Sequence, residues 1–143
     1  MEPRTSYLPT LGSLLVEAAS DHHALQSYEP GLRAINEAIE IFEQLEQMTQ
    51  GAGFMIPQLT EAMRVKAQLE ESRGRSAAAK QLLSKAAILQ RRVAGRTPFE
   101  DRMGLVKILL QQAMTHSDAN QVAEALDHGQ QALAILRANQ EKQ

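Results

Sequence analysis

Apolar side chains recur along this chain at the spacing of one face of an α-helix. The clearest stretch lies near the carboxyl end, where apolar or small residues are separated by four, three, four and three positions: Val122, Leu126, Gly129, Leu133 and Leu136. Residues at this spacing share one side of a helix, because the helix turns once in about 3.6 residues. We therefore predict a helix here, with small residues along its stripe that let a second helix approach closely.

The same periodicity, with proline at helix starts and glycine at helix ends, predicts five further helices. We expect helices over residues 9–23, 29–50, 54–73, 76–94, 98–116 and 121–138. The sharpest boundary is at residues 97–100, where Thr97, Pro98 and Glu100 have the order of an N-cap, a first helical proline and a capping-box glutamate. No alternation of period two lasts long enough to predict a strand.

Three of these segments resemble one another in sequence. NEAIEIFEQ contains Ala38, SKAAILQRR contains Ala86 and QQALAILRA contains Ala132, so equivalent alanines lie 48 and 46 residues apart. A repeat of this length is typical of stacked helical architectures. We predict one all-α domain over residues 1–143, built from six helices in three antiparallel pairs, with repeats at 9–50, 54–95 and 97–140.

The positions of the small residues resemble those of the tetratricopeptide repeat. That family pairs two helices per repeat, with a small residue midway along the first helix and two small residues seven apart on the second. The first-helix residue matches Ala18, Ala67 and Ala113, and the second-helix pair matches Gly31 with Ala38, Ala79 with Ala86, and Ala125 with Ala132. The resemblance covers nearly the whole chain and implies a short right-handed superhelical array.

This chain also departs from the family pattern. The usual repeat has about 34 residues, so the helices here are longer, as in extended variants of the family. Glu70 and His116 stand where a tyrosine is usual. A six-helix bundle without repeats is the alternative, because alanine-rich bundles show the same small-residue rhythm by chance.

The resemblance implies a non-enzymatic scaffold that binds a peptide or a partner helix in a concave groove lined by the first helix of each pair. The groove residues carried over by position are Leu15, Ala19, His22, Glu61, Arg64, Gln68, Glu71, Lys107, Leu110, Met114 and Ser117. Chaperone-binding members clamp a terminal carboxylate with lysines and asparagines. Leu15 and Ala19 occupy those clamp positions in the first repeat, so we do not expect binding of chaperone tails.

Charge and composition limit the partner class. The chain has 15 basic and 17 acidic residues, so no overall field recruits nucleic acid or an anionic membrane. A basic cluster near the turn between the fourth and fifth predicted helices suits an acidic protein partner: Arg91, Arg92, Arg96 and Arg102. Nucleic acid is the weaker alternative, because single strands are usually bound by several aromatic side chains that stack on the bases.

The sequence offers no catalytic, cofactor or metal motif. His22 and His23 are neighbours and point about 100° apart on a helix, whereas a helical metal pair needs the spacing i, i+4. The row of Glu37, Glu40, Glu43 and Glu46 lacks the Glu-x-x-His pairs of carboxylate metal sites, and we interpret it as a solvated face. We therefore expect no cofactor and no enzymatic activity.

The compartment and the assembly are further expectations. The chain has no cysteine, no apolar run of signal-peptide length and no segment of about 20 apolar residues, so we expect a soluble cytoplasmic protein. A short array leaves apolar faces at its ends. If Leu133 and Leu136 stay exposed on the last helix, a homodimer would cover them, and a self-associating module is the alternative function.

Overall fold

The computed structural model describes residues 7–49, 53–93, 100–118 and 122–141, and these residues form six α-helices and no strand. The helices are α1 (Leu8–Ala24), α2 (Tyr28–Met48), α3 (Ile56–Ser72), α4 (Ser76–Val93), α5 (Glu100–Asp118) and α6 (Val122–Glu141). Each helix begins and ends within three residues of its predicted bounds. Local periodicity and helix-end residues were sufficient to place the helices. The predicted helix boundary at residues 97–99 lies outside the described residues.

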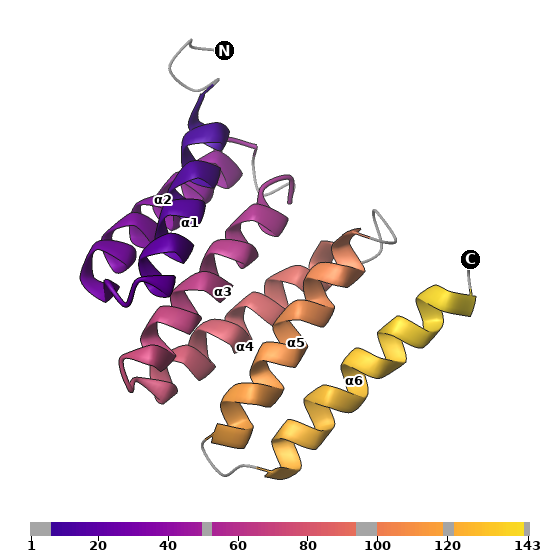
Figure 1. Ribbon diagram of the computed structural model, residues 1–143. Helices are drawn as coiled ribbons and strands as arrows, with labels where there is room; N and C mark the ends of the chain where they lie inside the picture. Colours follow the sequence, from indigo (N-terminus) through magenta and orange to yellow (C-terminus); the bar gives the residue numbers. More distant parts are fainter. Residues whose placement is uncertain (1–6, 50–52, 94–99, 119–121, 142–143) are drawn as a thin grey trace.

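Consecutive helices pack as three pairs, α1 with α2, α3 with α4 and α5 with α6 (Figure 1). Successive pairs meet through α2 with α3 and α4 with α5, and the first helices also contact each other, α1 with α3 and α3 with α5. Among the described residues the backbone of α6 lies close to that of α5 alone, so α6 forms one end of the row, and a side-chain hydrogen bond from Arg91 to Gln131 also reaches it from α4. This confirms the predicted all-α array of three stacked pairs.

Small residues lie where the helices of a pair touch. The three repeat alanines, Ala38, Ala86 and Ala132, are fully buried. On α1, however, the buried residue is Ala19, and Ala18 is only half-buried. Ala19 follows the buried Gly12 by seven residues, two helical turns, so both face α2. The predicted register of the first repeat is therefore wrong by one residue.

The stripe on α6 is only partly covered. Leu126 and Leu133 are 62% and 51% exposed, whereas Leu136 packs against the core and Ala132 is its fully buried neighbour. The stripe therefore faces the core at some of its positions and solvent at others. The reason is position, because α6 has a neighbouring helix on one side only.

Polar contacts join the first two pairs at one end of the array. Glu29 at the start of α2 forms an ion pair with Arg73 just after α3, at 2.9 Å. His23 Nε2 lies 2.8 Å from Ser72 Oγ, which links the ends of α1 and α3. Gly74 has φ +82°, a left-handed conformation that suits glycine, and it allows the tight turn into α4. No helix in the described ranges is both long and apolar enough to span a membrane.

Candidate functional site

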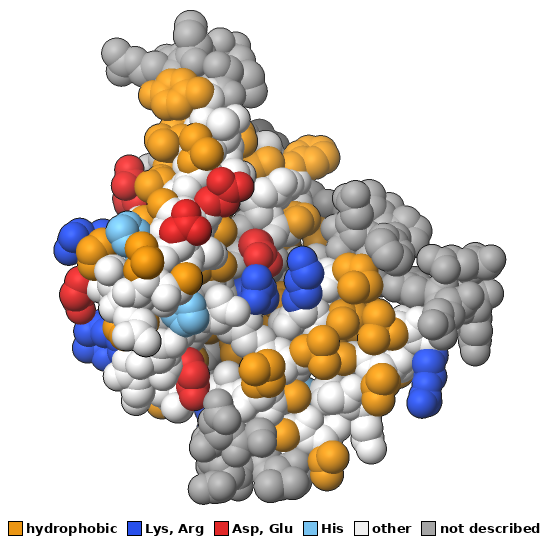
Figure 2. Space-filling model, in the orientation of Figure 1, with side chains coloured by type: hydrophobic (Ala, Val, Ile, Leu, Met, Phe, Trp, Pro, Cys, Tyr) orange, Lys and Arg blue, Asp and Glu red, His pale blue; other side chains and the backbone are white. Residues whose placement is uncertain are grey.

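The helices α1, α3 and α5 together form one face of the molecule, which we call the first-helix face. It is the face on which the resemblance places the binding groove. Figure 2 shows that acidic and basic side chains gather in its middle, while hydrophobic side chains lie over α1 on one side and over α5 and the adjoining α6 on the other. A partner can contact only those charged groups in the middle, and those apolar groups over α5 and α6, that are exposed.

A hydrogen-bonded network occupies the middle of the first-helix face. Arg64 donates to both carboxylate oxygens of Glu61, from Nε to Oε2 at 3.0 Å and from Nη2 to Oε1 at 2.7 Å. Its Nη1 donates to Gln111 Oε1 at 3.1 Å, and Gln111 Nε2 donates to the Arg64 carbonyl oxygen at 3.0 Å. Arg64 therefore joins α3 to α5, and its guanidinium is already engaged within the chain.

The network also determines the charge state of Glu61. The hydrogen bond from Arg64 lowers the pKa of Glu61, and the positive charges of Arg64 and Lys107 lower it further, while burial acts in the opposite direction. Lys107 is exposed on α5. It is therefore more accessible than Arg64.

The remaining predicted groove residues do not form one continuous open surface. Ala19 has no exposed surface and belongs to the contact between α1 and α2, so its assignment to the groove is wrong. Leu15, His22 and Gln68 are half-buried. Glu71 accepts a hydrogen bond from Ser76 Oγ at 3.2 Å, at the turn between α3 and α4. The side chain of Ser117 lies outside the described residues.

Leu14 is exposed on α1, and a larger set of exposed apolar side chains lies at the α5 end of this face and on the adjoining α6. We call this set the α5–α6 patch, and its residues are Leu110, Met114, Leu126 and Leu133. The repeat explains why Leu133 is exposed. When Ala132 is aligned with Ala86, Leu133 corresponds to Ala87, and Ala87 is buried because the next helix pair packs against α4. The patch therefore includes positions that a following helix pair would cover.

The predicted arginine cluster is described only in part. Arg91 and Arg92 are exposed in the last turn of α4, and Arg91 Nη2 donates to Gln131 Oε1 on α6 at 2.9 Å. Arg96 and the side chain of Arg102 lie outside the described residues. Arg91 is partly used in joining α4 to α6, which leaves Arg92 as the open cation of the pair.

The glutamate row on α2 is not uniformly a solvated face. The Glu46 carboxylate accepts hydrogen bonds from the backbone N–H groups of Gly53 and Met55, the latter at 2.9 Å. It thus satisfies backbone donors at the start of α3, and the predicted solvated role is wrong for this residue. Within the described residues no group of three or more histidine, aspartate or glutamate side chains could hold a metal ion.

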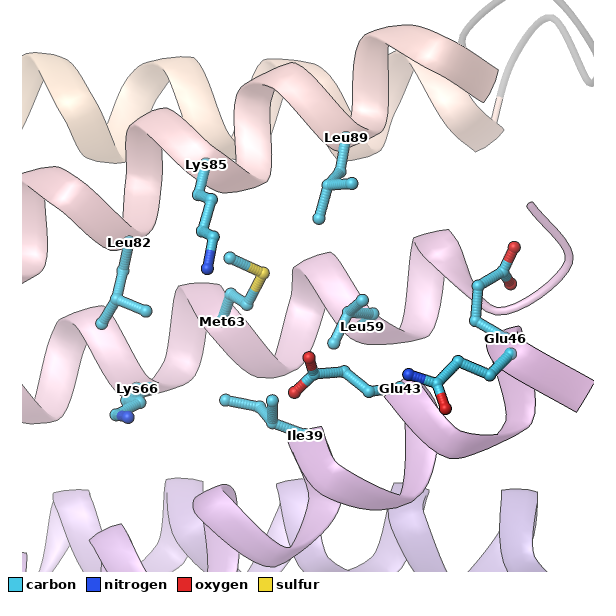
Figure 3. Close-up of a pocket in the computed structure, with 10 residues that line it drawn as sticks. Ile39, Glu43, Glu46, Leu59, Met63, Lys66, Leu82, Lys85 and Leu89 are labelled. Atoms are coloured by element: carbon cyan, nitrogen blue, oxygen red, sulfur yellow. The ribbon is translucent and has the colours of Figure 1, made fainter. Parts of the chain in front are cut away.

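A groove on the opposite side of α3 was not predicted from the sequence. It lies between α2 and α4, has α3 as its floor and encloses about 700 Å³ (Figure 3). Its lining residues are Ile39, Glu43, Glu46, Gln47, Leu59, Met63, Lys66, Leu82, Lys85 and Leu89. These residues come from three helices, and on each helix they lie at the border between the apolar side and the polar side. The sequence could have indicated the groove only through Lys66 and Lys85, which lie at that border on α3 and α4.

No protein-family model, curated protein sequence or solved structure matches this chain.

Proposed function

We propose that this protein is a non-enzymatic interaction scaffold of tetratricopeptide-like architecture that binds an amphipathic helix of a partner protein on the α5–α6 patch. The pairing order, the contacts between successive first helices and the buried repeat alanines support the architecture. The α5–α6 patch carries the functional proposal, because clustered apolar side chains exposed to water are typical of docking surfaces.

The chemistry of the patch specifies the partner helix. Met114, at 68% exposure, and Leu110 lie one turn apart on α5, so they offer an apolar ridge that suits side chains at spacing i, i+4 and i+7. Lys107 lies one turn before Leu110. A carboxylate at the edge of the partner's apolar stripe would meet Lys107, and this pair would fix the direction of the bound helix.

The test is a comparison of partner capture by three forms of the full chain. We expect the double variant Met114→Glu/Leu133→Glu to lose the proteins that the wild type retains, because two buried carboxylates would oppose docking. Ile88→Glu is the matched control, since Ile88 is equally large, 59% exposed and located on α4 away from the patch. Equal capture by all three forms would show that the patch is not the binding surface.

Self-association through the same patch is the second candidate function, and the exposure of Leu133 favours it. Molar mass in solution at two well-separated protein concentrations distinguishes the two. A stable mass near twice 15.8 kDa that falls to the monomer value in Leu126→Glu/Leu133→Glu, both exposed members of the patch, would support the homodimer. A monomer at both concentrations would leave the patch to a different protein.

A further inference from the structure

The groove between α2 and α4 has the form of a small-molecule site. Its two walls are second helices of neighbouring pairs, which do not contact each other in the described residues, and its floor is α3. From Leu59 to Lys66 the floor runs for seven residues, which corresponds to about 10 Å of helix. Ile39, Met63 and Leu89 make its middle apolar. The volume and the lining are those of a pocket for one small apolar chain.

The charged groups of the groove are separated along its length. Figure 3 shows Lys66 and Lys85 at the same end as Leu82 and Glu46 at the other end, while the carboxylate of Glu43 lies near the middle, beside Ile39. Neither lysine forms an ion pair with any acidic residue that the structure describes. The two ammonium groups come from different helices, α3 and α4, and border the same apolar strip.

A second hollow of about 350 Å³ continues the groove at its basic end. It shares Lys66, Leu82 and Lys85 with the first. Glu70 and Arg75 also border it, and they lie 3.7 Å apart, so their opposite charges partly neutralise each other. The lysines therefore provide the uncompensated positive charge, and the hollow gives a polar head group room between them.

We propose that this groove binds an anionic single-chain amphiphile, a medium-chain fatty acid, with its carboxylate between Lys66 and Lys85. Its alkyl chain lies along the apolar strip, where burial removes methylene groups from water. Glu46 at the far end repels a carboxylate and so disfavours the reverse orientation. A cationic amphiphile would place its charge beside two lysines in one orientation. In the other its charge would meet Glu46, whose carboxylate already accepts hydrogen bonds from Gly53 and Met55.

Sodium decanoate is the probe, titrated into the full chain with labelled methionine methyl groups. Met63 lies on the floor of the groove, whereas Met114 belongs to the exposed α5–α6 patch. We expect a saturable shift of the Met63 methyl resonance and no parallel shift of Met114. Decyltrimethylammonium has the same alkyl chain and the opposite charge, and we expect it to bind at least tenfold more weakly.

The charge variant is Lys66→Gln/Lys85→Gln. Exposed ion pairs are individually weak, so we expect loss of both to raise the Kd for decanoate about tenfold. The matched control is Arg33→Gln/Arg137→Gln, which removes the same total charge from exposed positions outside the groove and should leave the Kd unchanged. Far-ultraviolet circular dichroism verifies that both variants remain helical.

Four outcomes would overturn this proposal. The first is the absence of a Met63 shift with decanoate, and the second is equal affinity for the cationic amphiphile. The third is a Met114 shift of the same concentration dependence, which would indicate general partitioning onto apolar surface. The fourth is a Met63 shift that follows protein concentration instead of decanoate, which would assign the groove to a second copy. None of them bears on partner capture by the α5–α6 patch, which lies on other helices.

Discussion

A β-carbon on Gly12 would lie 2.6 Å from Cζ of Phe42 and 2.8 Å from its Cε1. Phe42 is 1% exposed, so its ring is enclosed and cannot swing into solvent. The absence of a side chain at Gly12 is therefore what allows α1 to pack on α2 at this distance. One residue with no side chain and one with a large ring set the spacing of the first helix pair.

Replacing Gly12 with alanine should destabilise the protein, although alanine is the better helix former. We expect the free energy of unfolding to fall by about 1–3 kcal/mol, because the ring or the helix must shift in a close-packed core. Chemical denaturation followed by circular dichroism measures this. The double variant Gly12→Ala/Phe42→Leu should be less destabilised than the sum of the two single changes, since the smaller side chain removes the clash.

Gly129→Ala is the matched control for that substitution. Gly129 lies within α6 and has no heavy atom within 4 Å of an added β-carbon. The substitution then changes only the helix propensity, which is higher for alanine than for glycine, and we expect the free energy of unfolding to increase by about 0.5–1 kcal/mol. A similar loss of stability in both glycine variants would contradict the steric explanation.

Glu46→Gln should weaken the start of α3. The substitution keeps the size of the side chain but removes the negative charge that accepts hydrogen bonds from Gly53 and Met55 near the positive end of that helix. We expect a loss of about 0.5–1.5 kcal/mol in the free energy of unfolding. Glu40→Gln on the exposed side of α2 is the control, with an expected change below about 0.5 kcal/mol. If both variants lost the same stability, the capping role would be wrong.

The contribution of Glu61 to stability should depend on pH. Its pKa in the folded protein is lowered from 4.5, so the folded state holds its proton less tightly than the unfolded chain does. This contribution is fully present above pH 4.5 and is lost as the pH falls through the lowered folded value. Because the Glu61 side chain is 41% exposed, solvent screens the pair and we expect only about 0.5 kcal/mol.

Thermal unfolding of wild type and Glu61→Gln at neutral and acidic pH tests this. The wild type should be the more stable at neutral pH, and the difference should shrink in acid. Arg64→Gln should remove the same pH dependence, because the hydrogen bond from Arg64 is the largest cause of the lowered pKa. A constant difference between wild type and Glu61→Gln at all pH values would exclude the pair as its source.

A buried hydrogen bond joins the second pair internally. Thr60 Oγ1 donates to Gln90 Oε1 at 2.7 Å, and both residues are buried. Thr60→Val keeps the shape and removes the donor, so we expect a loss of about 1–3 kcal/mol in unfolding free energy. Thr60→Ser keeps the hydroxyl and should lose less. Additive costs in Thr60→Val/Gln90→Leu would show that the two side chains are not coupled.

The sequence by itself determined the elements of this protein. Helix positions follow from periodicity and from helix-end residues such as Pro30 and Gly74, which act over a few neighbouring residues. The recurrence of Ala38, Ala86 and Ala132 predicted three similar pairs, because only small residues let helices touch at those points. These signals are local, so the chain alone was sufficient to find them.

The tertiary structure decided which predicted faces are covered. Periodicity shows which side chains share a face, but the burial of that face depends on where neighbouring helices lie. Ala19 is buried because Gly12 brings that side of α1 onto α2, and Leu133 is exposed because no helix pair follows α6 in the described residues. The bonds from Arg64 to Gln111 and the groove beside Lys66 and Lys85 join residues from different helices, so no spacing within one helix could have predicted them.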